Sequence, residues 1–149
     1  MSKVKVQLSE VIDAMESVDG MGFLNFYLNI RTGKIHLDSD DMGAIDEEDE
    51  GIDFEEDEDY AFIPGIDSDN GFWYMESFVK RLAEGEIKTA LTNSLAMRKP
   101  FRKFKDTLRK FPDTQEEWYA HEARCIKAAS ITFLQDLAED CAVEFEIIE

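Results

Sequence analysis

The stretch 23-FLNFYLNIRTGKIHLDSD-40 decides the fold, because two runs of β-forming residues flank a short turn that contains one glycine. Such a pattern is typical of a β-hairpin. In the second run Ile35 and Leu37 alternate with Lys34 and His36, as expected of a strand with one buried face. The stretch therefore predicts a hairpin, which forms part of a small antiparallel sheet.

Other strands and several helices are expected around this hairpin. The tail 143-VEFEII-148 alternates and predicts a strand that returns to the sheet, and 3-KVKVQL-8 alternates weakly. The segment 60-YAFIPG-65 could pair briefly with the sheet before Pro64 and Gly65 end it. We expect one α+β domain over residues 1–149, with the hairpin and the C-terminal strand packed against four to five helices. Helical spacing and end signals predict helices up to Ser17 and over 72–83, 86–98, 100–111 and 113–139.

The composition is that of a globular protein that does not depend on disulfide bonds. The chain has 149 residues and 44% hydrophobic residues, enough for a core that needs neither disulfide nor metal. It holds only two cysteines, Cys125 and Cys141, and its N-terminal residues lack the apolar core of a signal peptide. No apolar run is long enough to span a membrane. We therefore expect a reduced, cytoplasmic protein that does not contact membranes, and the oligomeric state is left open.

The net charge of −18 is concentrated in one segment. Of the 22 residues from Asp38 to Asp59, 14 are acidic and none is Lys or Arg. Outside residues 38–69 the chain carries 18 acidic and 16 basic residues, so the remainder is almost neutral. We interpret residues 38–59 as an acidic insert that is partly mobile.

Aromatic residues lie between the acids of this insert, and the combination suggests a contact surface. Carboxylates with Phe54, Tyr60 and Phe62 among them can lie on a basic protein surface, with the rings as anchors. The leading hypothesis is a non-enzymatic binding or regulatory protein that mimics a polyanion. A solvated loop that only raises solubility is the alternative. The candidate partner-binding residues are Asp46, Glu47, Glu48, Asp49, Phe54, Glu55, Glu56, Asp57 and Tyr60.

A second charged surface is predicted on the helix that begins near Pro100. Seven of the residues from Arg98 to Lys110 are basic, and Asp106 is the single acid among them. Such a helix could bind phosphate or nucleic acid, and that binding would weaken steeply with salt. The alternatives are a solvated face, or pairing with the acidic insert, which would then mask the helix. The candidate basic face comprises Arg102, Lys103, Lys105, Arg109 and Lys110.

The sequence also raises a metal-binding hypothesis. Residues 38–49 have the register of a calcium-binding loop, with Asp38, Asp40 and Asp46 as candidate ligands. Because any Asp-rich segment gives such near matches, we assign no cofactor and expect only weak, unselective binding of Mg²⁺ or Ca²⁺.

The common catalytic motifs for hydrolases, metalloproteases and nucleotide binding do not occur in the sequence. His121 and Cys125 are one helical turn apart and could meet, which more often is incidental. Glu86-Ile87-Lys88 is similar to the E-x-K motif of metal-dependent nucleases, but that motif needs a strand and here it begins a helix. We therefore expect no enzyme, and a metal-dependent enzyme that uses the acidic cluster is the third alternative.

Several motifs together resemble one bacterial family. They are 5-KVQLSEVIDAM-15, 26-FYLNIRTGKI-35, 101-FRKFKDTL-108, 118-WYAHEAR-124 and 138-AEDCAVEFE-146. Their combination is similar to that of uncharacterised protein family one-five-eight, and the resemblance covers most of the chain. Members typically carry an acidic segment after the hairpin and a Gly before the last strand, where this chain has Cys141-Ala142. The resemblance implies no activity.

Overall fold

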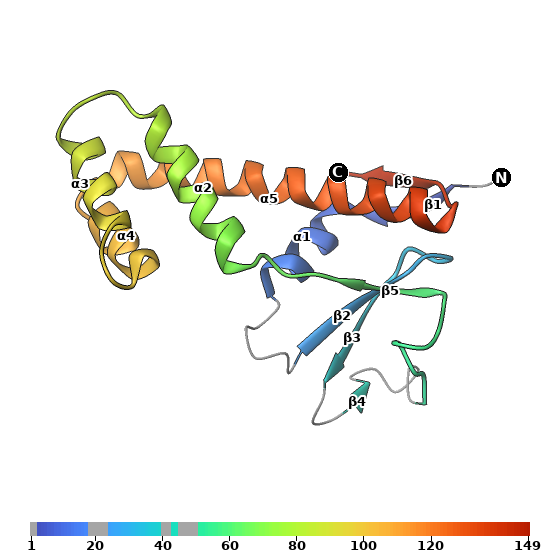
Figure 1. The fold of residues 1–149 in the computed structure, drawn as a ribbon. Helices are drawn as coiled ribbons and strands as arrows, with labels where there is room; N and C mark the ends of the chain where they lie inside the picture. The colour runs from blue at the N-terminus through green and yellow to red at the C-terminus, as the bar shows by residue number, and fades with distance from the viewer. Residues whose placement is uncertain (1–2, 18–23, 40–42, 45–50) are drawn as a thin grey trace. The chain divides into compact units, whose positions relative to one another are not determined.

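The structure, a computed structural model, describes residues 3–17, 24–39, 43–44 and 51–149. The chain divides into two compact units. We call residues 1–66 and 126–149 the sheet unit and residues 67–125 the helical unit. The described residues form five helices, an antiparallel sheet and a parallel pair of strands, which confirms the α+β class (Figure 1).

The antiparallel sheet of the sheet unit is built on the predicted hairpin. Strand β2 (Leu24–Asn29) pairs with β3 (Ile35–Ser39) on one side and with β5 (Tyr60–Ile63) on the other. The short strand β4 (Gly43–Ala44) adds to β3, so the order is β4-β3-β2-β5. The brief pairing expected for the segment from Tyr60 is thus confirmed.

The hairpin turn between β2 and β3 requires its glycine. Gly33 has a φ of +78°, and a Cβ atom there would lie 2.0 Å from the backbone oxygen of Lys5. The N–H of Gly33 donates to the carbonyl of Asn29. The Asn29 side chain in turn accepts hydrogen bonds from the N–H groups of Arg31 and Thr32. Both the positive φ and the close approach to β1 exclude any larger residue.

The C-terminal strand is placed differently from the expectation. Strand β6 (Phe145–Ile148) pairs in parallel with β1 (Val4–Gln7), in a sheet separate from the hairpin. The alternating pattern was a correct sign of a strand, because it shows which face is buried. The pattern does not show which strand is the partner. Two parallel strands far apart in sequence are not joined by a short turn, so the sequence holds no local signal of their pairing.

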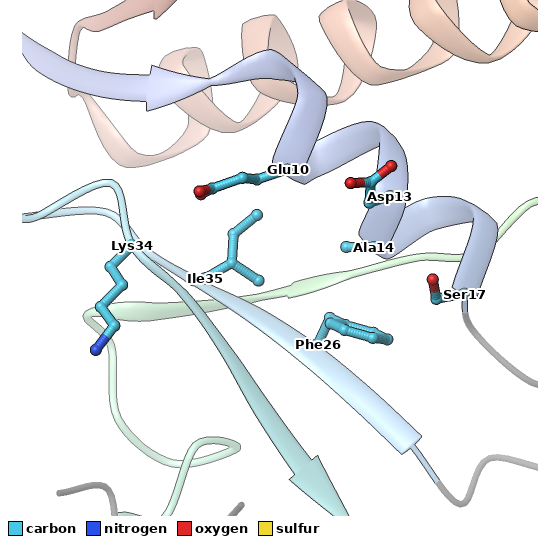
Figure 2. A pocket seen from close by; sticks show the side chains of 7 residues that line it. All are labelled: Glu10, Asp13, Ala14, Ser17, Phe26, Lys34 and Ile35. Carbon is cyan, nitrogen blue, oxygen red and sulfur yellow. The ribbon is translucent and has the colours of Figure 1, made fainter. Parts of the chain in front are cut away.

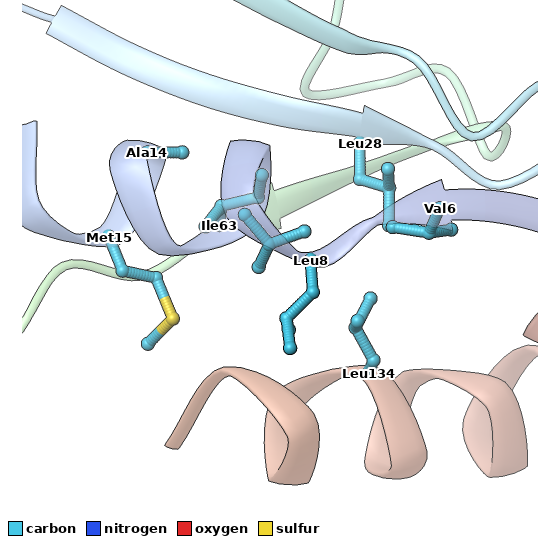
Figure 3. Packing of buried hydrophobic residues seen from close by; sticks show 8 residues of the cluster. Val6, Leu8, Ala14, Met15, Leu28, Ile63 and Leu134 are labelled. Atoms are coloured by element: carbon cyan, nitrogen blue, oxygen red, sulfur yellow. The ribbon is translucent and has the colours of Figure 1, made fainter. Parts of the chain in front are cut away.

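The core of the sheet unit lies between the antiparallel sheet, α1 (Leu8–Ser17) and the second part of α5 (Pro112–Cys141). Figure 3 shows Leu28 and Ile63 from the sheet and Leu134 from α5 gathered around α1. Burial of such aliphatic side chains is the main source of stability. The fully or almost fully buried members of this cluster are Val6, Leu8, Val11, Ala14, Met15, Leu28, Ile63 and Leu134.

The helical unit comprises α2 (Ser68–Arg81), α3 (Glu86–Leu95), α4 (Pro100–Leu108) and the first part of α5. Asp67 caps α2 by accepting a 2.7 Å hydrogen bond from the N–H of Asn70. The ring of Trp118 lies 5.0 Å from that of Phe104 and 5.5 Å from that of Phe78, both edge to face. Among the described residues no helix combines the length and the apolar composition needed to cross a membrane.

Candidate functional site

The charge of the protein is divided unequally between the two units. The sheet unit contains 24 acidic and 5 basic residues, whereas the helical unit contains 10 acidic and 11 basic residues. The predicted acidic insert belongs to the first unit and the predicted basic helix to the second.

Phe54 attaches the acidic insert to the outer face of the antiparallel sheet, the face opposite α1. Its side chain is 3% exposed. Its ring stacks on Tyr27, with centroids 5.0 Å apart, and meets the ring of Tyr60 edge to face at 4.9 Å. His36 lies 6.0 Å away on the neighbouring strand. Phe54 is thus buried inside its own unit, and this corrects the expectation that its ring is offered to a partner.

Residues 53–59, which include Phe54, form a segment that we call the acidic turn. Hydrogen bonds of its backbone give this segment a defined shape. The N–H of Asp57 donates to the carbonyl of Asp53 at 3.0 Å, and the N–H of Asp59 donates to the Asp57 carboxylate at 2.9 Å. The N–H of Ile30 donates to the carbonyl of Asp59 at 2.8 Å, and the Arg31 Nε lies 3.2 Å from the Asp59 carboxylate. The acidic turn is therefore ordered against the end of the hairpin.

The acidic turn presents its carboxylates outward. The side chain of Tyr60 is partly buried, whereas Phe62, two residues further along β5, is 50% exposed and touches Tyr27 edge to face at 5.8 Å. The other predicted contact residues, 46–49, lie outside the described part of the chain. The exposed acids of the turn are Asp53, Glu55, Glu56, Asp57 and Glu58.

The candidate calcium loop is only partly covered by the structure. Asp38 lies in β3, while Asp40 and Asp46 fall outside the described residues. Within the described ranges, no group of three or more His, Cys, Asp or Glu residues is placed to hold a metal ion.

The basic face lies on α4 and the residues that follow it. The helix buries Phe104 and Leu108. All five predicted cations, Arg102, Lys103, Lys105, Arg109 and Lys110, are exposed. Asp106 lies between two of them, 3.9 Å from Arg102 and 3.6 Å from Arg109, and exposed pairs of this kind contribute only about 0–1 kcal/mol each.

His121 and Cys125 meet inside the helical unit, together with Ser77. The Nε2 atom of His121 lies 3.0 Å from the Ser77 hydroxyl and 3.5 Å from the Cys125 sulfur. Burial, with the nearby Arg81 guanidinium adding to it, lowers the pKa of His121, and burial raises the pKa of the Cys125 thiol. A nucleophilic cysteine needs a lowered thiol pKa, so this geometry favours a structural contact.

Each unit also contains an open cleft. The first, of about 340 Å³, lies between α1 and the hairpin (Figure 2). The second, of about 320 Å³, lies between α2 and α3 and is lined by Glu76 and Lys88 among mainly apolar neighbours. Lys88 forms a 2.9 Å ion pair with Glu84, which lies four residues earlier in the chain. Glu86 begins helix α3, as the sequence indicated, so the E-x-K residues are helical.

These features define an acidic α+β protein with an ordered acidic turn on its sheet. The chain belongs to the family described as Uncharacterised protein family (UPF0158), which it matches over residues 1–146. It is 26% identical to a UPF0158 protein of Pseudomonas aeruginosa over 113 residues, which cover 76% of this chain and 72% of that relative. No solved structure matches the chain. The family recognised from its motifs is thus confirmed, and its description names no activity.

Proposed function

We propose that this protein is a non-enzymatic binding or regulatory protein that docks its acidic turn on a basic surface of a partner protein. The observation that carries the proposal is the burial of Phe54, which holds five exposed carboxylates on an ordered turn. A charged surface that is ordered before binding loses little chain entropy in the complex. It also attracts an oppositely charged partner over a distance and so raises the association rate.

Phe62 supports this proposal as an apolar contact beside the carboxylates. Its side chain is half exposed and lies on the same face of the sheet as Tyr27, which stacks on Phe54. Aromatic residues are enriched in protein interfaces, where an apolar centre is surrounded by polar groups. The acidic turn would then supply the charged rim and Phe62 the apolar centre.

The test uses a triple variant, E55Q/E56Q/E58Q, which removes three charges and leaves Asp53, Asp57 and Asp59 to form the bonds of the turn. A matched control, E139Q/E144Q/E146Q, removes the same charge from exposed positions elsewhere in the sheet unit. Both proteins and the unaltered chain serve as baits for affinity capture from native lysate at low salt. We expect a basic protein to be captured by the unaltered chain and the control but not by the triple variant. Identical captures by all three baits would refute the proposal.

A second candidate function is nucleic-acid binding by the basic face of α4. The observation that favours it is that Arg102, Lys103 and Lys105 are all exposed on a unit where basic residues outnumber acidic ones. Filter binding of a labelled single-stranded RNA would test it. K103E/K105E should weaken binding and reduce its salt dependence, whereas D106N, which releases Arg102 and Arg109, should strengthen it.

Two results of this experiment distinguish a basic face that is masked by the acidic insert from one that does not bind RNA. If the acidic insert masks the helix, E55Q/E56Q/E58Q should bind the RNA more tightly than the unaltered chain. If neither protein retains RNA at low salt, the basic face is a solvated surface and the candidate is rejected.

A further inference from the structure

We propose that the cleft between α1 and the hairpin, the α1 cleft, receives one large apolar side chain of the basic partner, while a lysine or arginine beside it contacts the α1 carboxylates. This inference rests on the proposed function, because it takes the partner to be basic. The inference names the feature of the partner that would make recognition specific.

The floor of the α1 cleft is apolar. It is formed by Phe26 of β2 and Ile35 of β3, both only partly buried, and by Ala14 of α1. Figure 2 shows Ile35 and Phe26 on the side of the strands that faces α1, and both residues line the cleft. At about 340 Å³ the cleft is at the small end of ligand sites, which suits one side chain better than a whole small molecule.

The rim of the α1 cleft selects a cation. Glu10 and Asp13 stand exposed on α1, and this helix contains no Lys or Arg. Among the described residues that line the cleft, Lys34 is the one base, and it extends away from α1 in Figure 2. The sheet unit carries a large excess of acids, so its field repels an anionic guest and attracts a cationic one. An apolar floor with an anionic rim therefore matches a basic peptide that carries a large apolar residue.

The hairpin turn connects the α1 cleft to the acidic turn. Arg31 contacts Asp59 of the acidic turn, and Lys34, at the other end of the same turn, lines the α1 cleft. A partner that covers the end of the hairpin reaches both surfaces. The acidic turn would contribute general attraction to basic proteins, and the α1 cleft would select among them.

The experiment compares two fluorescein-labelled peptides of equal charge by anisotropy, with the full chain at low salt. One has a single tryptophan flanked on each side by three lysines, and the other has alanine in its place. We expect the tryptophan peptide to bind about tenfold more tightly, which corresponds to about 1.4 kcal/mol. D13K, which places a longer and positively charged side chain at the cleft lining, should abolish this difference. E16K makes the same charge change on α1 outside the cleft lining and should weaken both peptides equally.

The outcomes separate this inference from the proposed function. Equal affinities of the two peptides, or equal effects of D13K and E16K on their ratio, would overturn the α1 cleft as an anchor site. Unchanged binding of both peptides by E55Q/E56Q/E58Q would instead overturn docking by the acidic turn. Movement of the backbone amide resonances of Ala14, Ser17 and Ile35 with the tryptophan peptide alone is the positive result expected in solution.

Discussion

Ala142 ends helix α5 in a left-handed backbone conformation, with a φ of +54°. The N–H of Val143 donates to the carbonyl of Ala138 at 3.0 Å, which is the long bond of a Schellman helix end. The left-handed conformation costs a residue with a Cβ about 1–2 kcal/mol, whereas glycine adopts it without strain. A Gly at position 142 would therefore relieve this strain.

We therefore expect A142G to raise the free energy of unfolding by about 0.5–1 kcal/mol, after the greater freedom of glycine in the unfolded chain is subtracted. Urea unfolding monitored by circular dichroism measures this change in the free energy of unfolding. The control is A128G, at an exposed position within α5, which should lower the free energy by about 1 kcal/mol. A loss of stability in A142G would contradict the assigned helix end.

His121, which is 4% exposed, should make the stability depend on pH. Burial lowers its pKa in the folded protein below the ordinary value of 6.5, so the unfolded chain takes up the proton first. The stability provided by the neutral imidazole is complete above pH 6.5 and is lost as the pH falls through the lowered pKa. Each unit by which the pKa is lowered corresponds to about 1.4 kcal/mol.

The variant H121Q tests this sign. Urea midpoints measured from pH 8 to pH 5 should fall less steeply for H121Q than for the unaltered chain. The value at pH 8 provides the reference, because there the imidazole is neutral in both states. Parallel curves for the two proteins would show that His121 is not the group that titrates.

Among the structural elements, the acidic turn depends on one side chain. F54A should lower the free energy of unfolding by about 3–5 kcal/mol and release the turn from β2. Hydrogen exchange should then show lost protection at the amides of Ile30 and Tyr60, which donate to carbonyls of the turn. F62A, at a half-exposed position of the same face, should change stability by less than about 1 kcal/mol. Retained protection in F54A would mean that the backbone bonds hold the turn without the ring.

The sequence predicts elements well where the signal is local. The hairpin follows from alternation around Gly33, and α4 follows from Pro100 and the spacing of Phe104 and Leu108. The pairing of β6 with β1 does not follow, because the two strands are joined by most of the chain and share no turn.

The candidate site likewise has features that the sequence predicts and features that depend on contacts between distant segments. The exposed carboxylates are evident from composition alone. The burial of Phe54 depends on Tyr27 and His36, which only the register of β2 and β3 places side by side. A signal did exist, since Tyr27, His36 and Phe62 alternate onto the outer face, and that face needed an apolar cover. The α1 cleft had no such signal, because its floor and rim come from separate elements.

At the scale of the whole molecule, the excess of acids in the sheet unit should make the protein more stable in salt. Like charges repel one another in the compact state, and salt shortens the range of this repulsion from about 10 Å at 0.1 M to about 3 Å at 1 M. We expect sodium chloride to raise the urea midpoint over this range, by about 1 kcal/mol in free energy. Hydrogen exchange should show the gain mainly in β2 and β5. A fall of the midpoint would indicate that attractive pairs such as Arg31–Asp59 outweigh the repulsion.

The burial of Phe54 also has a calorimetric consequence. A disordered acidic segment that folds onto its partner buries its own apolar residues at that moment, and the heat capacity of binding becomes strongly negative. Here the Phe54 side chain is already removed from water before any partner arrives. Docking as we propose should therefore show a small heat-capacity change and an enthalpy almost constant with temperature. In F54A the entropy of binding should become more unfavourable, because ordering of the released segment would then accompany binding.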